Sequence, residues 1–299
     1  MSDATIAILH TRIRTEERLL IEAFDHLGVQ VDVVDARDVA LDGRSLGRFA
    51  AHDVVLDRTV SLAASQTVGR VLESMGIRFV NRCRAIDRCS DKLRTNVALN
   101  AAGIPTPEMR VAVGASAALE AAEDLGYPVV LKPTIGSWGR LVARANDRDA
   151  AEAIIEHRAM LGSAAQQVFY IQEHVEKPGR DLRLFVVGGE TIAGIARMSD
   201  HWVTNTARGA SASGYEITPE LDRLCRGVSE AVGADICAVD LFECPRRGLL
   251  VNEVNHSLEF RNSIEPTGVD IPLRIAENVV SIAQGRQAIV SSGQIGVSV

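Results

Sequence analysis

The sequence predicts a mixed α/β fold that becomes an α+β arrangement in its C-terminal part. Over the first 90 residues, short β-branched runs alternate with helical patterns, which indicates a parallel sheet. After Gly179 the pattern changes to hairpins joined by tight turns, which is typical of an antiparallel sheet. With 46% apolar and 24% charged residues, the 299-residue chain can bury a sizeable core, and disorder is excluded for most of its length.

The N-terminal part contains a strand, a helix, a strand and then a second set of the same kind. The expected strands are Thr5–His10, Val29–Val34, Val54–Leu56 and Arg78–Val80, and the expected helices are Glu16–Leu27 and Thr67–Met75. A dinucleotide-binding Rossmann domain would need a glycine-rich turn after the first strand. Residues 10–14 form that turn and include no glycine, so we exclude this alternative.

The central part reads as a smaller α/β module that follows a capped helix. A helix from Ser90 to Gly103 begins at Ser90 or Asp91, both of which are suitable capping residues. The expected elements after it are strand Met109–Val113, helix Ala115–Leu125, strand Tyr127–Pro133, a loop at Gly136–Gly139, strand Leu141–Ala145, helix Asp147–Leu161 and strand Phe169–His174.

Two hairpins and two helices are expected in the C-terminal part. They are hairpin Leu182–Val187 with Thr191–Ala196, helix Pro219–Val232, hairpin Cys237–Glu243 with Gly248–Asn255, and helix Ile271–Gln284. Breaks near residues 88 and 172 divide the chain into an N-terminal domain (1–88), a central domain (89–171) and a C-terminal domain (172–287). A flexible tail is expected at 288–299.

Charge and cysteine usage exclude several classes of function. The net charge of −7 leaves no general basic surface for nucleic acid, and no apolar run is long enough to span a membrane. No signal peptide is expected from the first residues. The five cysteines form no CxxC pair, which argues against a zinc site or a disulfide framework and predicts a reducing cytoplasm.

Lysine is nearly absent, since 32 Lys and Arg residues include only Lys92, Lys132 and Lys177. Lys132 ends an apolar strand before the glycine loop, where backbone amides and an ammonium can bind phosphate. Lys92 lies at the start of a helix, where the dipole also favours anions. The surroundings of Lys177 predict an exposed turn instead.

An acidic cluster is predicted on the last hairpin. Glu253 and Asn255 are two residues apart on a strand and share a face, and the hairpin brings Asp240 opposite them. Two carboxylates and an amide oxygen are ligands that suit Mg²⁺. The alternative is an ordinary solvated strand face.

A third candidate is the run Gln172-Glu173-His174-Val175 with Asp181 after it. A strand that runs into a turn can offer backbone groups to adenine, and a nearby carboxylate can bind ribose hydroxyls. The residue chemistry alone leaves this reading and an ordinary strand equally open.

Together these motifs resemble the ATP-grasp ligase superfamily, nearly end to end and in the order that its members share. The motifs are Asp91-Lys92-x-x-Thr95, Val130-Leu131-Lys132-Pro133, the glycine loop, Gln172-Glu173, Asp181-x-Arg183, Asp240 and Asn252-Glu253-x-Asn255. Within the superfamily the chain is similar to the RimK/LysX branch, and to LysX in three longer runs. These runs are Gly136–Leu141, Asn205–Gly209 and Asn255–Ser263.

The resemblance implies an N-terminal pre-ATP-grasp domain, a central lid domain, a C-terminal ATP-grasp domain and a set of site residues. The residues that would bind ATP are Lys92, Lys132, Gly136, Ser137, Trp138, Gly139, Arg140, Leu141, Gln172, Glu173, His174, Val175, Asp181, Arg183 and Asn205. Those that would bind the amino acid are Arg197, Thr206, Ala207, Glu259, Phe260, Arg261, Asn262 and Ser263. Asp240, Glu253 and Asn255 would hold Mg²⁺, with Mn²⁺ as an alternative, and Lys132, Arg197 and Arg261 would be catalytic.

The implied activity is an ATP-dependent ligation that passes through an acyl phosphate. The family joins an amino acid, α-aminoadipate or glutamate, through its amine to the C-terminal glutamate side chain of LysW, a small acidic carrier protein. A RimK-like glutamate ligase that acts on another protein tail or a cofactor is an alternative, and a nucleotide-binding regulator without catalysis is another. The resemblance also implies a cytoplasmic homo-oligomer, a dimer or tetramer.

Two segments depart from the family pattern. Gly209-Ala210 stands where LysX has two glycines, and Glu265-Pro266 is unusual at its position. If Glu265 faces the amino-acid pocket, its charge would disfavour an acidic acceptor and favour one with an amine or hydroxyl at its far end. The alternative is that Glu265 points to solvent.

Overall fold

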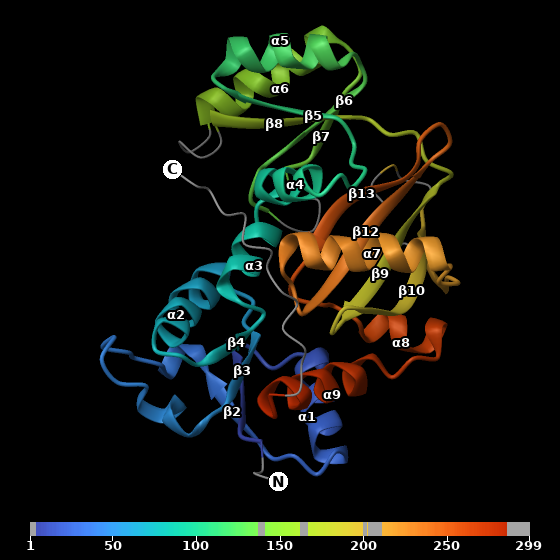
Figure 1. The fold of residues 1–299 in the computed structure, drawn as a ribbon. Helices are drawn as coiled ribbons and strands as arrows, with labels where there is room; N and C mark the ends of the chain where they lie inside the picture. Colours follow the sequence, from blue (N-terminus) through green and yellow to red (C-terminus); the bar gives the residue numbers. More distant parts are fainter. Residues whose placement is uncertain (1–3, 137–140, 162–166, 200–201, 203–210, 286–299) are drawn as a thin grey trace, which may run out of the picture. The chain divides into compact units, whose positions relative to one another are not determined.

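The computed structural model describes residues 4–136, 141–161, 167–199, 202 and 211–285. The chain divides into two compact units, one formed by residues 1–80 with 272–299 and the other by residues 81–271. Each unit has its own sheet or sheets and its own core (Figure 1). None of the described helices is both long and apolar enough to cross a membrane.

The first unit is built on a parallel four-stranded sheet in the order β2-β1-β3-β4. Every residue of β1 and β3 is buried, as expected for parallel strands covered on both faces. Its elements are β1 (Ile6–His10), α1 (Thr15–His26), β2 (Val31–Asp35), β3 (Val54–Arg58), α2 (Leu62–Ser74), β4 (Arg78–Val80) and most of α9 (Ile271–Ala283), with short 3₁₀ turns at Ala36–Asp38 and Gly47–Ala51.

Helix α2 begins five residues earlier than its apolar spacing predicts. Ser61 caps it, because the Ser61 side chain accepts a hydrogen bond of 3.3 Å from the Ala64 amide. Helix α2 therefore begins directly after its capping residue Ser61, and its hydrophobic spacing becomes regular only about one turn later.

The second unit begins with helices α3 (Cys83–Cys89) and α4 (Lys92–Ala101) and an antiparallel sheet. The strands are β5 (Met109–Val113), β6 (Val129–Lys132), β7 (Ala143–Ala145) and β8 (Val168–Glu173), in the order β5-β8-β6-β7. Helices α5 (Ala115–Leu125) and α6 (Arg148–Leu161) pack on this sheet (Figure 1). Small residues such as Ala118, Ala122 and Ala151 let the helices approach the strands closely.

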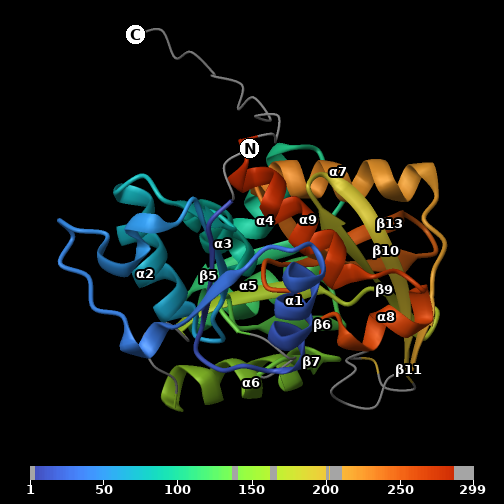
Figure 2. The same cartoon turned by 90° about the horizontal axis from the view of Figure 1, so that it is seen from below.

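A second antiparallel sheet, in the order β11-β10-β9-β12-β13, carries the candidate site. Its strands are β9 (Arg180–Val187), β10 (Glu190–Met198), β11 (Ser211–Gly214), β12 (Ile236–Cys244) and β13 (Gly248–Asn255). Both hairpins predicted from the sequence are confirmed. Helix α7 (Pro219–Val232) lies along one face of the sheet in both views (Figures 1 and 2).

Alternation along the strands separates an apolar face from a charged one. Leu182 and Leu184 on β9, Val239 on β12 and Val254 on β13 pack with α7 in one core. The residues between them point to the opposite face and include Arg183 and Asp240 beside apolar side chains such as Phe185. The sheet thus buries one face under α7 and presents the other as a platform for polar side chains.

Three short elements have no counterpart among the expected ones: α3, β11 and α8 (Arg261–Thr267). Helix α8 is seven residues long and contains Pro266, which gives it a weak helical signal in the sequence. At α4 the structure selects Asp91 as the cap, because its carboxylate accepts hydrogen bonds from the amides of Leu93 and Arg94.

Candidate active site

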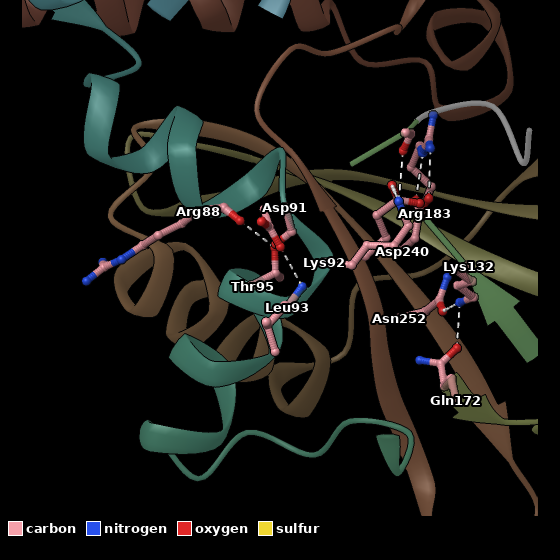
Figure 3. Close-up of polar contacts among 12 residues, drawn as sticks. Arg88, Asp91, Lys92, Leu93, Thr95, Lys132, Gln172, Arg183, Asp240 and Asn252 are labelled. Atoms are coloured by element: carbon pink, nitrogen blue, oxygen red, sulfur yellow. Dashed lines mark hydrogen bonds and ion pairs between the residues drawn. The ribbon is translucent and has the colours of Figure 1, made fainter. Parts of the chain in front are cut away.

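The charged face of the five-stranded sheet holds a buried network of opposite charges. Arg183 on β9 donates two hydrogen bonds to the Asp240 carboxylate on β12, at 2.7 and 2.8 Å. Arg197 on β10 lies 3.2 Å from the same carboxylate and donates to Asp181 at 2.7 Å. All four side chains are largely buried (Figure 3 draws the Arg183–Asp240 part). The network joins three adjacent strands on the face away from α7.

Asp240 remains ionised in this setting. Burial by itself would raise its pKa, but the charges of Arg183 and Arg197 outweigh burial and hold the pKa well below its usual range. Removal of either arginine would therefore leave a buried carboxylate without one of its two balancing charges.

The strand register pairs Asp240 directly with Glu253, as the hairpin pattern predicts, and Asn255 follows on the same face of β13. The buried Nδ2 of Asn255 has no hydrogen-bond partner among the described residues. Within the described ranges, no three His, Cys, Asp or Glu side chains converge on a point. Carboxylate and amide oxygens are ligands that suit a hard divalent cation, and Asp240, Glu253 and Asn255 supply three such groups on one hairpin, with both oxygens of Asp240 bonded to Arg183.

Lys132, the last residue of β6, is buried and bonded to two amides. Its Nζ donates to Gln172 Oε1 on β8 at 2.5 Å and to Asn252 Oδ1 on β13 at 2.9 Å (Figure 3). Burial lowers the pKa of Lys132 to about 8, against the attraction of Glu253, which raises it. The ammonium is thus held at the junction of the two sheets by neutral acceptors.

Lys92 and Arg158 fix the two ends of the glycine loop. The Lys92 side chain donates to the Gly136 carbonyl at 2.8 Å and lies 3.6 Å from Glu253 Oε1, and its amide donates to Thr134 at 2.9 Å. At the other end, Arg158 of α6 donates to the carbonyls of Leu131 and Leu141. Leu141 has a positive φ of 57°, which is uncommon for a residue with a side chain.

The sequence interpretation of Lys177 as an exposed surface charge was wrong. Its side chain is only 10% exposed, its Nζ is 3.7 Å from Asp181, and the same ammonium lies 4.9 Å from the centre of the Phe242 ring. Its charge also lowers the pKa of Lys132, after burial and the charge of Lys92. The three lysines of the chain therefore lie around one site.

The strand predicted to hold adenine uses several of its polar groups within the fold. The amides of Glu173 and His174 donate to the carbonyls of Glu108 and Pro128, and the Gln172 side chain is bonded to Lys132. Val175 packs with Leu250 and Cys244 in a small apolar cluster. Asp181, expected at the ribose, is already bonded to Arg197.

The residues expected around the amino acid differ in exposure. Glu259, Arg261 and Asn262 are exposed, whereas Phe260 and Ser263 are buried in the fold. Phe260 is thus a core residue that directly precedes α8. The side chain of Glu265 is exposed. Several expected site residues lie outside the described part of the chain: Ser137, Trp138, Gly139, Arg140, Asn205, Thr206 and Ala207, together with the departure at Gly209-Ala210.

Asn252 and Arg158 are site residues that sequence reasoning did not single out. Asn252 lies inside the Asn252-Glu253-x-Asn255 motif, so its position next to two ligand candidates was the available signal. Arg158 lies in an amphipathic helix, and nothing in its local pattern indicates that it reaches two carbonyls of other segments. Buried cysteines, among them Cys89, Cys225 and Cys237, play no part in the network described above.

The fold and the site together define an enzyme of the ATP-grasp class. Residues 89–279 match the RimK-like ATP-grasp domain, and residues 6–88 match the LysX pre-ATP-grasp domain. The chain belongs to the RimK-like ATP-grasp family of ligases.

Three comparisons illustrate this membership. The α-aminoadipate–LysW ligase LysX of Saccharolobus solfataricus is 36% identical over 86% of this chain and 94% of its own length. The glutamate–LysW ligase ArgX of Sulfurisphaera tokodaii is 33% identical over 89% of this chain and 95% of its length. The crystal structure of a RimK-domain ATP-grasp protein from Sphaerobacter thermophilus superposes with a TM-score of 0.77, covering 92% of this chain and 99% of that one at 32% identity.

Proposed function

We propose that this protein is an ATP-dependent ligase that joins an amino acid, through its α-amine, to the C-terminal glutamate side chain of a small acidic carrier protein of the LysW kind. The observation that carries the proposal is the meeting of Lys132, the Asp240–Glu253 pair and Asn255 at one face of a sheet. The names of the relatives supply the carrier and the two acidic amino acids as candidate substrates.

The phosphates of ATP would lie between the lysines and the acidic pair. In ligation by this class of reaction, the carrier carboxylate attacks the γ-phosphate of ATP and ADP leaves, which gives an acyl phosphate. The amine then attacks the acyl carbon and displaces phosphate, with loss of a proton from the amine. Negative charge moves across the phosphoryl group during the first step, so fixed positive charges lower its barrier. Lys132 and Lys92 are the described ammonium groups next to Asn252 and Glu253, and we assign them this task.

A divalent cation would be held by Asp240, Glu253 and Asn255, with Mg²⁺ as the proposed metal and Mn²⁺ as the alternative. When bound, it supplies additional positive charge to the phosphates and helps to orient them. The protein holds Asp240 ready in ionised form, because Arg183 and Arg197 keep its pKa low.

The amino acid would bind beside Arg197 and the exposed residues at the start of α8, among them Arg261. Arginine forms paired hydrogen bonds with carboxylates, which suits the α-carboxylate of any amino acid. The exposed Glu265 lies one turn further along α8, so both an acidic acceptor and one with an amine or hydroxyl at its far end are candidates. The assay must therefore compare acidic and basic acceptors.

The test is a mass assay on a purified LysW-like carrier with ATP, Mg²⁺ and one amino acid at a time. We expect the carrier to gain the mass of α-aminoadipate or glutamate less one water, with equimolar ADP. Gain with lysine or ornithine but not with the acidic pair would support the non-acidic acceptor. No gain with any amino acid would refute the carrier assignment, and glutamate addition to a different protein tail or to a cofactor would favour a RimK-like ligase.

We further propose that the enzyme acts in the cytoplasm as a dimer or tetramer, as the resemblance to its family suggests. The exclusion of nucleic acid as a partner rests on the net charge of −7. Light scattering on the purified protein measures the oligomeric state directly, and a monomer at micromolar concentration would refute this part.

A further inference from the structure

Asn252 lies where the ladder between β12 and β13 skips one residue. Asp240 pairs with Glu253 and Leu241 pairs with Val251, so Asn252 is the extra residue of a β-bulge. The packing shows the same shift, because Val251 and Val254 both belong to the core under α7 although they are three residues apart. A bulge of this kind re-aims a side chain, and here it brings an amide next to a metal-ligand candidate.

The amide oxygen of Asn252 is one of two acceptors for Lys132. Lys132 belongs to β6, Gln172 to β8 and Asn252 to β13, so the ammonium joins one sheet to the other. An ammonium has three N–H donors. Two of them point at Gln172 and Asn252, which leaves one donor for a phosphate oxygen.

Both acceptors are neutral, and this has an electrostatic consequence. A carboxylate bonded to Lys132 would cancel much of the positive charge that a phosphate needs to meet. The carboxylate next along β13, that of Glu253, instead lies 3.6 Å from Lys92. The amide of Asn252 thus fixes the direction of the Lys132 ammonium without reducing its charge.

We propose that Asn252 is a positioning residue of the ligase, which aims the Lys132 ammonium at the phosphates of ATP and ties the lysine strand to the strand of the metal-ligand candidates. It acts through Lys132 and need not touch a substrate itself. The inference rests on the proposed function, because it assumes that Lys132 contacts ATP phosphate.

A double-mutant cycle tests it. The affinity for ADP, without metal or other substrates, is measured by calorimetry for the natural protein, Asn252→Ala, Lys132→Met and the double variant. We expect Asn252→Ala to weaken ADP binding by roughly tenfold, the usual effect of a lost hydrogen bond to a charged group. In the Lys132→Met background the same change should have no further effect, because it acts only through the lysine.

Asn100→Ala is the matched control. It removes an amide of the same unit that is hydrogen-bonded to Thr106 and Asn96 and not to Lys132, and it should leave ADP affinity unchanged. Asn252→Asp keeps the size of the side chain but adds a charge. A purely structural role predicts natural ADP affinity for this variant, whereas positioning by a neutral acceptor predicts a loss at least as large as that of Asn252→Ala.

The outcomes separate the two proposals. If Asn252→Ala lowers the affinity for ADP equally with and without Lys132, or if Asn252→Asp binds ADP with natural affinity, the positioning role is refuted. The proposed ligase function is not affected by either result. Failure of the natural protein to bind ADP both with and without Mg²⁺ would overturn the proposed function itself. Thermal unfolding of each variant identifies any that is misfolded. If Asn252→Ala is misfolded, the ADP affinity of Asn252→Asp tests the positioning role in its place.

Discussion

Lys132 carries a positive charge inside the protein with two neutral amides as its hydrogen-bond partners. Burial of an ammonium is costly, and a fold retains it only where a ligand or a network uses the charge. Lys92 and Lys177 have carboxylate neighbours, Glu253 and Asp181. At the scale of single residues, Lys132 is therefore the lysine best prepared to meet an anionic ligand.

We expect Lys132→Arg to lose most of the ligase activity although it keeps the charge. The guanidinium is a planar fork that is larger than an ammonium, and it cannot place one donor on each of Gln172 and Asn252 and a third on a phosphate at the same distances. A displaced charge can cost about hundredfold in turnover. Steady-state kinetics with the carrier measure the effect, and near-natural kcat and KM for ATP would contradict it.

The pH dependence of ADP binding should follow the ionisation of Lys132. Burial lowers its pKa to about 8, so affinity should fall as the pH rises through 8, and at pH 9 about one molecule in ten keeps the ammonium. Titrations between pH 7 and 9.5 measure this, and Lys132→Met should flatten the profile. A flat profile in the natural protein would contradict the prediction.

The contribution of Lys132 to the stability of the fold should move in the opposite direction in this pH range. The pKa of lysine is about 10.4 in an unfolded chain, so between pH 8 and 10 the unfolded state binds more protons at this group than the folded state. The contribution of Lys132 to the free energy of unfolding therefore rises with pH. Urea unfolding at the same pH values tests whether weaker ADP binding is caused by loss of the fold.

At the scale of elements, strand alternation explains why the site lies where it does. Leucine and valine at every second position of β9 and β12 bury one face under α7, which leaves Arg183 and Asp240 on the other. The bulge at Asn252 breaks this alternation once, at the residue whose side chain accepts a hydrogen bond from Lys132 of the other sheet. The regular alternation places the polar side chains on one face of the sheet, and the bulge places Asn252 where it accepts a hydrogen bond from Lys132.

Strand β11 and helix α8 are held close together by a glycine. A Cβ atom at Gly214 would lie 2.4 Å from the Pro266 carbonyl oxygen, so an alanine there forces the strand and the helix apart. Because α8 begins with Arg261 and Asn262, we expect Gly214→Ala to raise the KM for the amino acid several-fold.

The same variant should keep its affinity for ADP, since Lys92 and Lys132 lie on other elements. Kinetics with varied amino acid and calorimetry with ADP measure the two effects separately. An equal loss in both would indicate general destabilisation rather than a local displacement of α8.

At the scale of the whole molecule, the metal should matter for catalysis but not for folding. Asp240 is already balanced by Arg183 and Arg197, so the fold does not depend on a cation to neutralise it. Addition of EDTA should abolish ligation and leave the midpoint of thermal unfolding within about one degree. A marked fall in that midpoint would show that the metal is structural.

The division into three domains at residues 88 and 171 stays a prediction, whereas the compact units divide at residues 80 and 272. Local pattern predicts elements well, since α5, α7 and β5 lie where the sequence indicates. It predicts much less about how these elements group, because grouping depends on contacts between segments far apart in the chain. Proteolysis at the two proposed boundaries would distinguish the two divisions.

The sequence by itself determined the strands other than β11, the two hairpins and the placing of Asp240 opposite the strand of Glu253 and Asn255, because hydrophobic periodicity and turn residues act over a few neighbouring positions. Only the tertiary structure decided that Lys177 is buried against Asp181 and the Phe242 ring, and that Asn252 accepts from Lys132 across 120 positions of the chain. The Lys132–Asn252 contact joins two separate sheets, and the Phe242 ring that covers Lys177 comes from a distant strand, so no local pattern encodes either contact.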